Sequence, residues 1–324
     1  MIWLIGREGM LGRLVEQELT EAGLEYYASG RECDVTEADS IEAASPAAPP
    51  QWVVNCTGYT AVDAAESDVD AAWRINRHGV SEIARYCAAV RARLLHISTD
   101  YVFDGANRKG YSERSATAPQ NVYGASKLAG EQVLRRALTE HVIIRTAWLY
   151  AEHGRNFLLT ILRLLRDNGE LTIVSDQYGS PTYARDLAQA IVTMVQSVHP
   201  NYGTFHFVNT GTTTWYEYAC EIQSCALELG LTSAAKPIVP VSSDRFPTAA
   251  VRPKYSVLHC SRIAERYAVY LRPWQTALRD CMERLSSTQS GTSPPNGSAG
   301  HSSQSRSGQG NGVYRANGFY FVRR

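Results

Sequence analysis

Long apolar runs, an excess of charge of either sign and paired cysteines are all missing from this sequence. No apolar stretch approaches the ~18–20 residues that a helix needs to cross a bilayer, and no basic segment precedes the apolar start at residues 1–5. We therefore expect neither a membrane span nor a signal peptide. The 324 residues hold 32 Lys+Arg and 32 Asp+Glu, a balance that gives no general attraction to nucleic acid or anionic lipid.

The cysteines are scattered, odd in number and without a CxxC pair. Zinc sites and disulfide frameworks have closer, paired spacing. Most of these residues stand in apolar surroundings, where cysteine behaves as a small hydrophobic residue. We expect reduced thiols, no metal site built from them, and a cytoplasmic protein. The cysteines are Cys33, Cys56, Cys87, Cys220, Cys225, Cys260 and Cys281.

Acidic residues are absent from residues 286–324, which carry four arginines. Within this segment, 24 of the 27 residues in 286–312 are Ser, Gly, Thr, Gln, Asn or Pro. Such a composition buries too little apolar surface to offset the entropy of ordering, so we expect a disordered Ser/Gly-rich tail. Residues 1–285 then form the folded body, with 28 Lys+Arg against 32 Asp+Glu and a net charge of −4. The tail arginines are too sparse to indicate nucleic-acid binding.

Apolar runs of strand length alternate with helical periods over the first 150 residues. This alternation is typical of βαβ units and predicts a Rossmann-type, doubly wound parallel sheet in an α/β fold. The less regular pattern beyond predicts a smaller mixed α/β lobe. The expected strands are Ile2–Ile5, Glu25–Ala28, Trp52–Asn55, Leu94–Ser98, Val142–Thr146, Leu171–Val174 and Thr204–Val208. The expected helices are Leu11–Ala22, Val69–Val90, Tyr123–Leu138, Phe157–Leu165, Ala184–Val195, Trp215–Leu229 and Trp274–Leu285.

A GxxGxxG pattern follows the first expected strand directly. Gly6 allows a tight turn, Gly9 lets the backbone approach a pyrophosphate, and Gly12 lets the following helix pack against the strand. The free N–H groups and the dipole at the start of that helix would face the phosphates. Three glycines alone are weak evidence, but their place at the start of a βαβ series favours dinucleotide binding over a structural loop.

The second expected strand ends at Ala28 with no acidic residue directly after it. An Asp or Glu at this point binds the ribose 2′-OH of NAD, whereas an Arg can hold the 2′-phosphate of NADP. Ser29 and Arg31 offer a hydroxyl and a cation, so we predict a preference for NADPH, with NADH as the alternative. Arg31 is equally compatible with a solvated loop charge. Asp34 and Val35 lie slightly further along the chain, where the Asp34 carboxylate could accept a hydrogen bond from the adenine amino group.

Tyr123 and Lys127 form a YxxxK pair, which on a helix places both side chains on one face. Reducing a ketone needs a hydride on carbon and a proton on oxygen. A tyrosine with an ordinary pKa near 10 supplies that proton efficiently only beside a positive charge, which Lys127 would provide. Thr99 ends an expected strand where doubly wound sheets bind ligands, and it could donate a hydrogen bond to the carbonyl. YxxxK alone often lies on an ordinary helix surface; together with Thr99 it suggests carbonyl reduction.

These motifs resemble the extended short-chain dehydrogenase/reductases and, within them, the dTDP-4-dehydrorhamnose reductase family. The wider resemblance rests on the glycine turn, Asn76 and the Thr99/Tyr123/Lys127 trio. The narrower one covers about residues 1–285 in the family's order. It rests on TAVDAAE at 60–66, STDYVF at 98–103, NVYG at 121–124, RTAW at 145–148, DQYGSPT at 176–182, GTTTW at 211–215 and RP at 252–253.

The resemblance implies reduction of the C4 keto group of dTDP-4-dehydro-β-L-rhamnose by NAD(P)H. Tyr123 would supply the proton, Lys127 would tune it and anchor the nicotinamide ribose, and Thr99 would polarise the carbonyl. The implied domains are 1–147 for NAD(P), with 183–200 returning to it, and 148–285 mainly for substrate. The other implied contacts are Gly9, Met10 and Leu11 at the pyrophosphate, Asp34 and Val35 at the adenine, Gly58, Tyr59 and Thr60 along the cofactor, and Asp100, Tyr101 and Trp148 at the sugar nucleotide.

The sequence departs from the family pattern at Leu14. Family members with Mg²⁺ at a dimer interface carry a glutamate there, and losing a carboxylate removes both a charge and an oxygen ligand. We therefore expect no metal at this position. A homodimer remains a possible oligomeric state. The tail at 286–324 has no counterpart in the family pattern.

Two other functions are compatible with these motifs. Another extended reductase or epimerase could act on a different nucleotide sugar with the same Tyr123 and Lys127, an epimerase recycling tightly bound NAD⁺. A related group with this fold serves as a non-catalytic regulatory subunit of methionine adenosyltransferase. The complete set of Thr99, Tyr123 and Lys127 disfavours that second alternative, because a regulator has no need of a proton donor.

Overall fold

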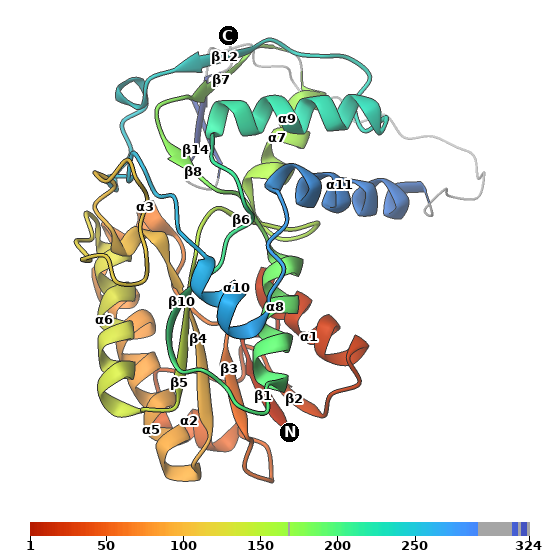
Figure 1. The fold of residues 1–324 in the computed structure, drawn as a ribbon. Helices are drawn as coiled ribbons and strands as arrows, with labels where there is room; N and C mark the ends of the chain where they lie inside the picture. The colour runs from red at the N-terminus through yellow and green to blue at the C-terminus, as the bar shows by residue number, and fades with distance from the viewer. Residues whose placement is uncertain (168, 291–312, 317–318, 323–324) are drawn as a thin grey trace, which may run out of the picture.

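The structure is a computed structural model that describes residues 1–167, 169–290, 313–316 and 319–322. At its centre is a parallel sheet of β1 (Ile2–Ile5), β2 (Tyr26–Ser29), β3 (Trp52–Asn55), β4 (Arg93–Thr99), β5 (His141–Thr146) and β10 (Gly203–His206) (Figure 1). The strand order is β10-β5-β4-β3-β1-β2, so the direction of winding reverses between β1 and β3. Doubly wound sheets bind ligands at such a reversal. The predicted Rossmann-type α/β fold is confirmed.

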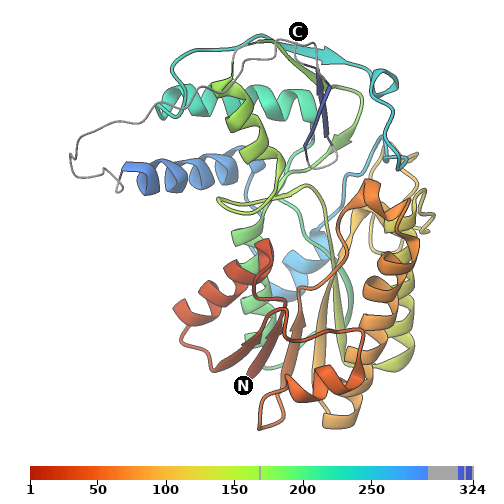
Figure 2. The same ribbon diagram turned by 180° about the vertical axis from the view of Figure 1, so that it is seen from behind.

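Helices cover both faces of the sheet (Figure 2). Alternate side chains of a strand point to opposite faces, and in β1 both sets are apolar: Ile2 and Leu4 join one core, Trp3 and Ile5 the other. The first core includes α1 (Met10–Glu21), α8 (Ala184–Gln196) and α10 (Ser261–Tyr267), and the second includes α2 (Ala38–Ala43), α5 (Val80–Val90) and α6 (Val122–Ala137). The segment that supplies α8 thus packs on the sheet beside α1, although it comes from the second half of the chain.

A smaller lobe with its own apolar core lies beyond the carboxyl ends of the strands (Figure 1). Its helices are α7 (Phe157–Arg166), α9 (Trp215–Glu228) and α11 (Trp274–Ser290). Short strand pairs complete it: β6 (Leu149–Tyr150) with β9 (Thr182–Tyr183), β7 (Leu171–Val174) with β12 (Ile238–Val241), and β8 (Tyr178–Gly179) with β11 (Thr213–Thr214). The cleft between this lobe and the sheet is the place where a ligand of both would bind.

One expected helix is divided. The sequence pattern predicts a single helix over Val69–Val90, but the structure has α4 (Val69–Trp73), a π-helical segment η1 (Arg74–Gly79) and then α5. Apolar periodicity does not reveal such a widening, because the chain keeps its helical direction through it. π-Helical turns occur frequently at functional sites. Here the widening carries Asn76, whose contacts are described below.

Several short elements have no sequence signal strong enough to predict them. They are α2, α3 (Val62–Ala65), α10, β12 and the 3₁₀ turns η2 (Asp100–Val102) and η3 (Ser243–Arg245). Each is held by contacts with distant parts of the chain more than by its own pattern. None of the helices among the described residues has the length and apolar content to cross a membrane.

The segment expected to be a disordered tail is described only in part. α11 continues to Ser290, past the expected end at Leu285, and β13 (Val313–Ala316) pairs antiparallel with β14 (Phe319–Val322). β14 lies beside β7 of the smaller lobe. Residues 291–312, 317–318 and 323–324 lie outside the described residues, so the expected disorder is not tested there, and the domain boundaries stay a prediction.

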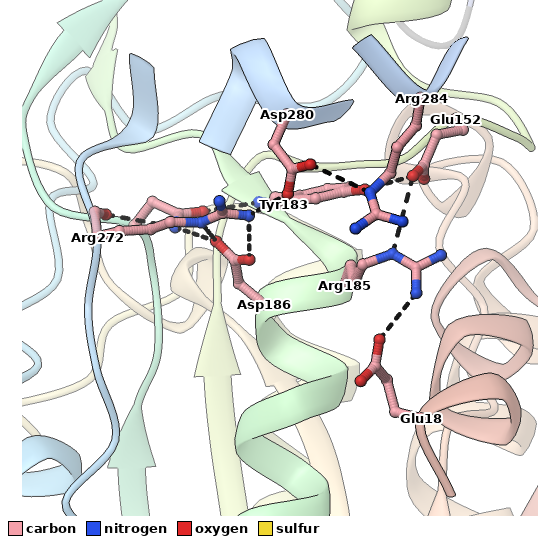
Figure 3. A network of polar contacts seen from close by, with 9 residues as sticks. Glu18, Glu152, Tyr183, Arg185, Asp186, Arg272, Asp280 and Arg284 are labelled. Atoms are coloured by element: carbon pink, nitrogen blue, oxygen red, sulfur yellow. Dashed lines mark hydrogen bonds and ion pairs between the residues drawn. The ribbon is translucent and has the colours of Figure 1, made fainter. Parts of the chain in front are cut away.

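A charged network joins the smaller lobe to the sheet domain (Figure 3). Arg272, which precedes α11, donates to both carboxylate oxygens of Asp186 on α8 at 2.6 and 2.8 Å and to Asp280 on α11 at 2.9 Å. Arg185 of α8 pairs with Glu18 of α1 at 2.8 Å. Asp186 and Glu18 are buried; the Arg272 pairs join α11 to α8 and the Arg185 pair joins α8 to α1, so the ion pairs run from the smaller lobe to the sheet domain.

Candidate active site

The glycine turn has the shape that a pyrophosphate site requires. Gly6 has a φ of +88°, which a residue with a side chain adopts only with strain. Gly9 is the N-cap of α1 and gives no side-chain cap, so the first N–H groups of the helix are left to a ligand. A Cβ on Gly12 would lie 2.1 Å from the Gly6 oxygen, so only glycine lets α1 approach the turn. Met10 and Leu11 follow as the first residues of the helix.

The loop after β2 differs from the expectation in one respect. The Ser29 hydroxyl is buried, accepts a hydrogen bond from the Trp3 indole at 2.8 Å and donates to the Ala44 carbonyl at 3.2 Å. Its contact with a 2′-phosphate has to be withdrawn, because side chains alternate along a strand and this one points into the core. Arg31 has 93% of its side chain exposed and pairs with Glu8 of the glycine turn at 3.1 Å. The expected contact of Arg31 with a 2′-phosphate stays a prediction.

Two acidic side chains in this region were not expected as functional. Glu8 is the partner of Arg31, and Glu32 accepts a hydrogen bond from the Gly30 N–H at 2.7 Å. That backbone hydrogen bond lowers the pKa of Glu32. An ionised carboxylate here could bind a ribose hydroxyl, so the structure places groups suited to both forms of the cofactor at the end of β2.

Asp34 and Val35 lie further along the same loop, against η1. The Asp34 carboxylate accepts hydrogen bonds from the Thr36 N–H at 2.9 Å and hydroxyl at 2.8 Å, and these lower its pKa. It is therefore ionised and able to accept from an amino group. Val35 is buried against Gly79, where an added Cβ would lie 2.8 Å from the valine side chain.

The loop after β3 is clamped to α6 by Asn76. The Asn76 amide oxygen accepts from the Tyr59 N–H at 2.9 Å, and its nitrogen donates to the Tyr59 carbonyl at 3.1 Å and to the Ser126 hydroxyl at 3.0 Å. The expected cofactor residues Gly58, Tyr59 and Thr60 are thereby held beside the YxxxK helix. A Cβ on Gly58 would lie 3.7 Å from the Lys127 amine. The π-helical turn thus carries the residue that joins the loop after β3 to α6.

Thr99 and Tyr123 meet at the carboxyl end of β4. α6 begins just before Tyr123, and the Asn121 side chain caps it by accepting from the Gly124 N–H at 2.8 Å. Tyr123 is buried; burial raises the pKa of its phenol, while a hydrogen bond with Thr99 acts in the opposite direction. The phenol is therefore protonated near neutral pH, as a proton donor must be.

Asp100 and Tyr101 follow Thr99 in η2. The Thr99 hydroxyl donates to Asp100 Oδ1 at 3.0 Å and accepts from the Tyr101 N–H at 3.2 Å. Burial raises the pKa of Asp100 to about 6. The Tyr101 ring makes an edge-on contact with the Tyr123 ring, with centroids 5.5 Å apart.

Lys127 lies one turn after Tyr123 and is also buried. Its amine donates to the Ile97 carbonyl at 2.6 Å and lies 3.3 Å from His96 Nε2. Burial lowers the pKa of this amine to about 8, so it is mainly charged at neutral pH. The structure thus brings the expected trio together, while adding His96 as a neighbour that the sequence pattern did not single out.

A cavity of about 840 Å³ opens beside Tyr101, between the two parts of the molecule. The Trp148 indole stacks on Trp215 with centroids 3.4 Å apart and an interplanar angle of 11°. Arg252 donates to the Tyr101 hydroxyl and to Asp63 Oδ2, each at 3.1 Å. Trp215, Arg252 and Asp63 stand within stretches that carry the family resemblance, but only the fold shows that they line one cavity.

The position at which the family resemblance implies a metal-binding glutamate does not fit a cation in this structure. Leu14 is buried in the core between α1 and the sheet. The next carboxylates of α1 are engaged, Glu16 with Arg7 at 2.7 Å and Glu18 with Arg185 at 2.8 Å. In the part of the chain that the structure describes, no cluster of three His, Cys, Asp or Glu side chains could hold a metal ion.

Comparison with known proteins places this chain among sugar-nucleotide reductases. The model of the family "RmlD substrate binding domain" matches residues 1–287. The dTDP-4-dehydrorhamnose reductase of Escherichia coli (strain K12) is 35% identical over 294 residues, which cover 89% of this chain and 98% of the relative. The dTDP-4-keto-6-deoxy-D-glucose reductase of Streptomyces niveus is 38% identical over 292 residues, covering 89% and 99%.

Solved structures give the same result. The dTDP-4-dehydrorhamnose reductase of Bacillus anthracis, in complex with NADP, has a TM-score of 0.82 and 35% identity, with coverage of 87% of this chain and 98% of that one. The dTDP-4-dehydrorhamnose reductase of Clostridium acetobutylicum has a TM-score of 0.81 and 34% identity, with coverage of 88% of this chain and 99% of that one. The chain therefore belongs to the RmlD substrate binding domain family, the family of the dTDP-4-dehydrorhamnose reductases.

Proposed function

We propose that this protein reduces the C4 keto group of dTDP-4-dehydro-L-rhamnose to give dTDP-L-rhamnose, with NADPH as the hydride donor. The observation that carries the proposal is the convergence of Thr99, Tyr123 and Lys127 at the carboxyl end of β4 and the start of α6, next to Tyr101, which lines the cavity. The glycine turn, with its uncapped helix start and the close approach of α1 to the turn at Gly12, fits a dinucleotide. NADPH supplies the hydride when it is bound there.

The residues of the chain supply the proton and the polarisation. Tyr123 would donate the phenolic proton to the carbonyl oxygen as negative charge develops on it. The Lys127 ammonium would stabilise the resulting phenolate, and Thr99 would turn its hydroxyl from Asp100 to the same oxygen. Donors aimed at a developing oxyanion in a buried site act strongly, because water does not compete with them.

The cavity offers groups suited to a deoxysugar diphosphate. Trp148 presents an indole beside it, against which the apolar C–H face of a deoxysugar could pack. Arg155, exposed on the wall, and Arg252 could meet the diphosphate charge. These assignments, and the roles of Asp100 and Tyr101 at the sugar, belong to the proposal.

Loss of the near-ultraviolet absorbance of reduced nicotinamide tests the proposal. The purified protein should consume one NADPH for each dTDP-4-dehydro-L-rhamnose supplied. A second assay with dTDP-4-keto-6-deoxy-D-glucose addresses the substrate that the Streptomyces niveus relative's name gives. Turnover of that sugar alone would replace the proposed substrate; absence of all turnover, together with stable binding to a methionine adenosyltransferase, would favour a regulatory subunit.

Replacing Arg31 should weaken the use of NADPH selectively. Arg31→Ala removes the exposed cation near the expected 2′-phosphate, so KM for NADPH should rise about 5-fold while KM for NADH changes little. Steady-state kinetics with each cofactor measure this, with Arg85→Ala, an exposed arginine of α5, as the matched control. An equal rise in KM for NADPH and for NADH would show that Arg31 does not bind the 2′-phosphate.

Removing divalent cations should have no effect. Because Leu14 is buried and the nearby carboxylates are paired, EDTA should leave the reductase rate and the molecular mass in solution unchanged. Light scattering and the same absorbance assay, each with and without added Mg²⁺, provide the measurement. A fall of both on chelation would mean that a metal-bridged assembly exists despite Leu14.

A further inference from the structure

A buried row of polar side chains runs from β3 through β4 to α6. Asn55, His96 and Lys127 are all buried. Asn55 Nδ2 lies 3.1 Å from His96 Nδ1, and His96 Nε2 lies 3.3 Å from Lys127 Nζ. The mechanism above uses only the lysine. A buried polar group without a hydrogen-bond partner destabilises the fold, so each donor in this row should face an acceptor. The direction of each hydrogen bond follows from this requirement.

The orientation of the Asn55 amide is fixed by Thr57. The Thr57 backbone N–H, which can only donate, lies 2.9 Å from Asn55 Oδ1, and the Thr57 hydroxyl donates to the same oxygen at 2.6 Å. The amide oxygen therefore faces Thr57, and the NH₂ group faces His96. Since an NH₂ group only donates, His96 Nδ1 must be the acceptor.

This arrangement determines the tautomer of His96. A neutral imidazole carries one ring proton, which must then be on Nε2. Burial and the neighbouring Lys127 hold the pKa of His96 well below its ordinary value, so the ring is neutral. The Nε2–H consequently points at the Lys127 nitrogen. A neutral amine can accept that hydrogen bond, whereas an ammonium has only donors to offer.

We propose that Asn55 and His96 are positioning residues that favour the neutral form of the Lys127 amine: Asn55 fixes the Nε2–H tautomer, and that N–H faces the amine nitrogen. The inference rests on the proposed function of Lys127. Its consequence is that Lys127 loses its charge at a lower pH than an ordinary lysine, so the rate of reduction should fall on the alkaline side of neutrality as Lys127 deprotonates.

Other groups around the amine do not replace this effect. The Glu131 carboxylate, one turn further along α6, favours the ammonium, and so opposes His96. The Cys56 thiol after β3 stays neutral, because burial raises its pKa to about 12. The Ile97 carbonyl accepts from either form of the amine. Of these groups, only His96 favours the neutral Lys127 amine over the ammonium.

Nitrogen NMR of histidine-labelled protein reads the tautomer directly. The wild type should show His96 as the neutral Nε2–H form throughout the pH range in which the protein is folded, with Asn55→Asp switching it to Nδ1–H because a carboxylate can only accept. A wild-type Nδ1–H form would overturn the proposal.

Carbon NMR of labelled lysine reads the charge of Lys127. The chain has four lysines, and Lys127→Arg identifies the signal by its loss. His96→Gln replaces the donor with an amide that can turn its oxygen to the ammonium, without adding charge. The pKa of Lys127 should rise by about one unit in this variant, and the alkaline limb of kcat should move with it.

His206→Gln is the matched control. His206 is buried in β10, where it faces Arg145 and Glu131. This variant also places a glutamine in the core, and it should leave the titration of Lys127 in place. An unchanged Lys127 pKa in His96→Gln, or an equal shift in His206→Gln, would refute the proposal. Neither NMR readout needs turnover, so a lack of reductase activity would count against the proposed function alone.

Discussion

Tyr123→Phe should lower kcat for ketone reduction by at least about 100-fold, since general acid catalysis typically contributes 10²–10⁴-fold. The variant keeps the ring that packs edge-on against Tyr101 and loses only the hydroxyl that interacts with Thr99. Cofactor affinity should therefore change little. Stopped-flow or steady-state loss of NADPH absorbance gives the rate, and fluorescence titration with NADPH gives the affinity.

The control for this variant is a tyrosine outside the cleft. Tyr86→Phe in α5 removes a hydroxyl while keeping an edge-on contact with Trp3, and it should leave kcat near the wild-type value. Comparable thermal stability of both variants would show that the fold is not the cause of any loss. A Tyr123→Phe protein with wild-type turnover would mean that another group donates the proton.

Glu131→Gln should destabilise the fold by about 3–5 kcal/mol, the cost of leaving a buried charge without its partner. The Glu131 carboxylate is fully buried, accepts from the Arg145 guanidinium at 2.7 and 2.8 Å and from Arg135 at 2.6 Å, and also accepts from the Ser98 hydroxyl at 2.5 Å. An amide NH₂ in its place would face guanidinium donors. Urea unfolding followed by circular dichroism measures the change in the free energy of unfolding.

The pH dependence of that difference provides a second test. The arginines hold the pKa of Glu131 below its ordinary value, against the effect of burial. A carboxyl whose pKa is depressed in the fold contributes stability above its unfolded pKa of about 4.3 and loses it as the pH falls through the folded pKa. The difference in the free energy of unfolding between the wild type and Glu131→Gln should therefore become smaller at acidic pH.

An exposed ion pair serves as the comparison. Glu82→Gln breaks the pair with Arg85 on the surface of α5 and should cost less than about 1 kcal/mol. If Glu131→Gln costs no more than Glu82→Gln, the buried hydrogen bonds of Glu131 with Ser98 of β4 and Arg145 of β5 do not stabilise the packing of α6 on the sheet.

The features that sequence reasoning predicted correctly are local ones. The sheet strands are short apolar runs, and the Gly6–Gly12 turn follows one of them directly, so periodicity and spacing were enough to place both. The positions of the trio were predictable for the same reason, since Tyr123 and Lys127 share a helix and Thr99 ends a strand, while their catalytic roles stay a prediction.

The features that could not be predicted depend on packing between distant segments. The π-helical turn carries Asn76, whose side chain binds both Tyr59 and Ser126, two residues distant from it in the sequence. Ser29 faces inward because the register of β2 places its hydroxyl under Trp3. Neither contact can be predicted from the spacing of residues in the sequence. The same is true of the cavity, where Arg252 donates a hydrogen bond to Tyr101, although the two residues are far apart in the sequence.

The most direct test of the central claim follows the hydride itself. NADPH deuterated at the transferable position of the nicotinamide is incubated with the protein and dTDP-4-dehydro-L-rhamnose, and the product is analysed by NMR and mass spectrometry. The account predicts dTDP-L-rhamnose with one deuterium at C4 for each NADPH consumed. Product without deuterium at C4, or no consumption of NADPH, would contradict it, since an epimerase recycling bound NAD⁺ takes up no label from solution.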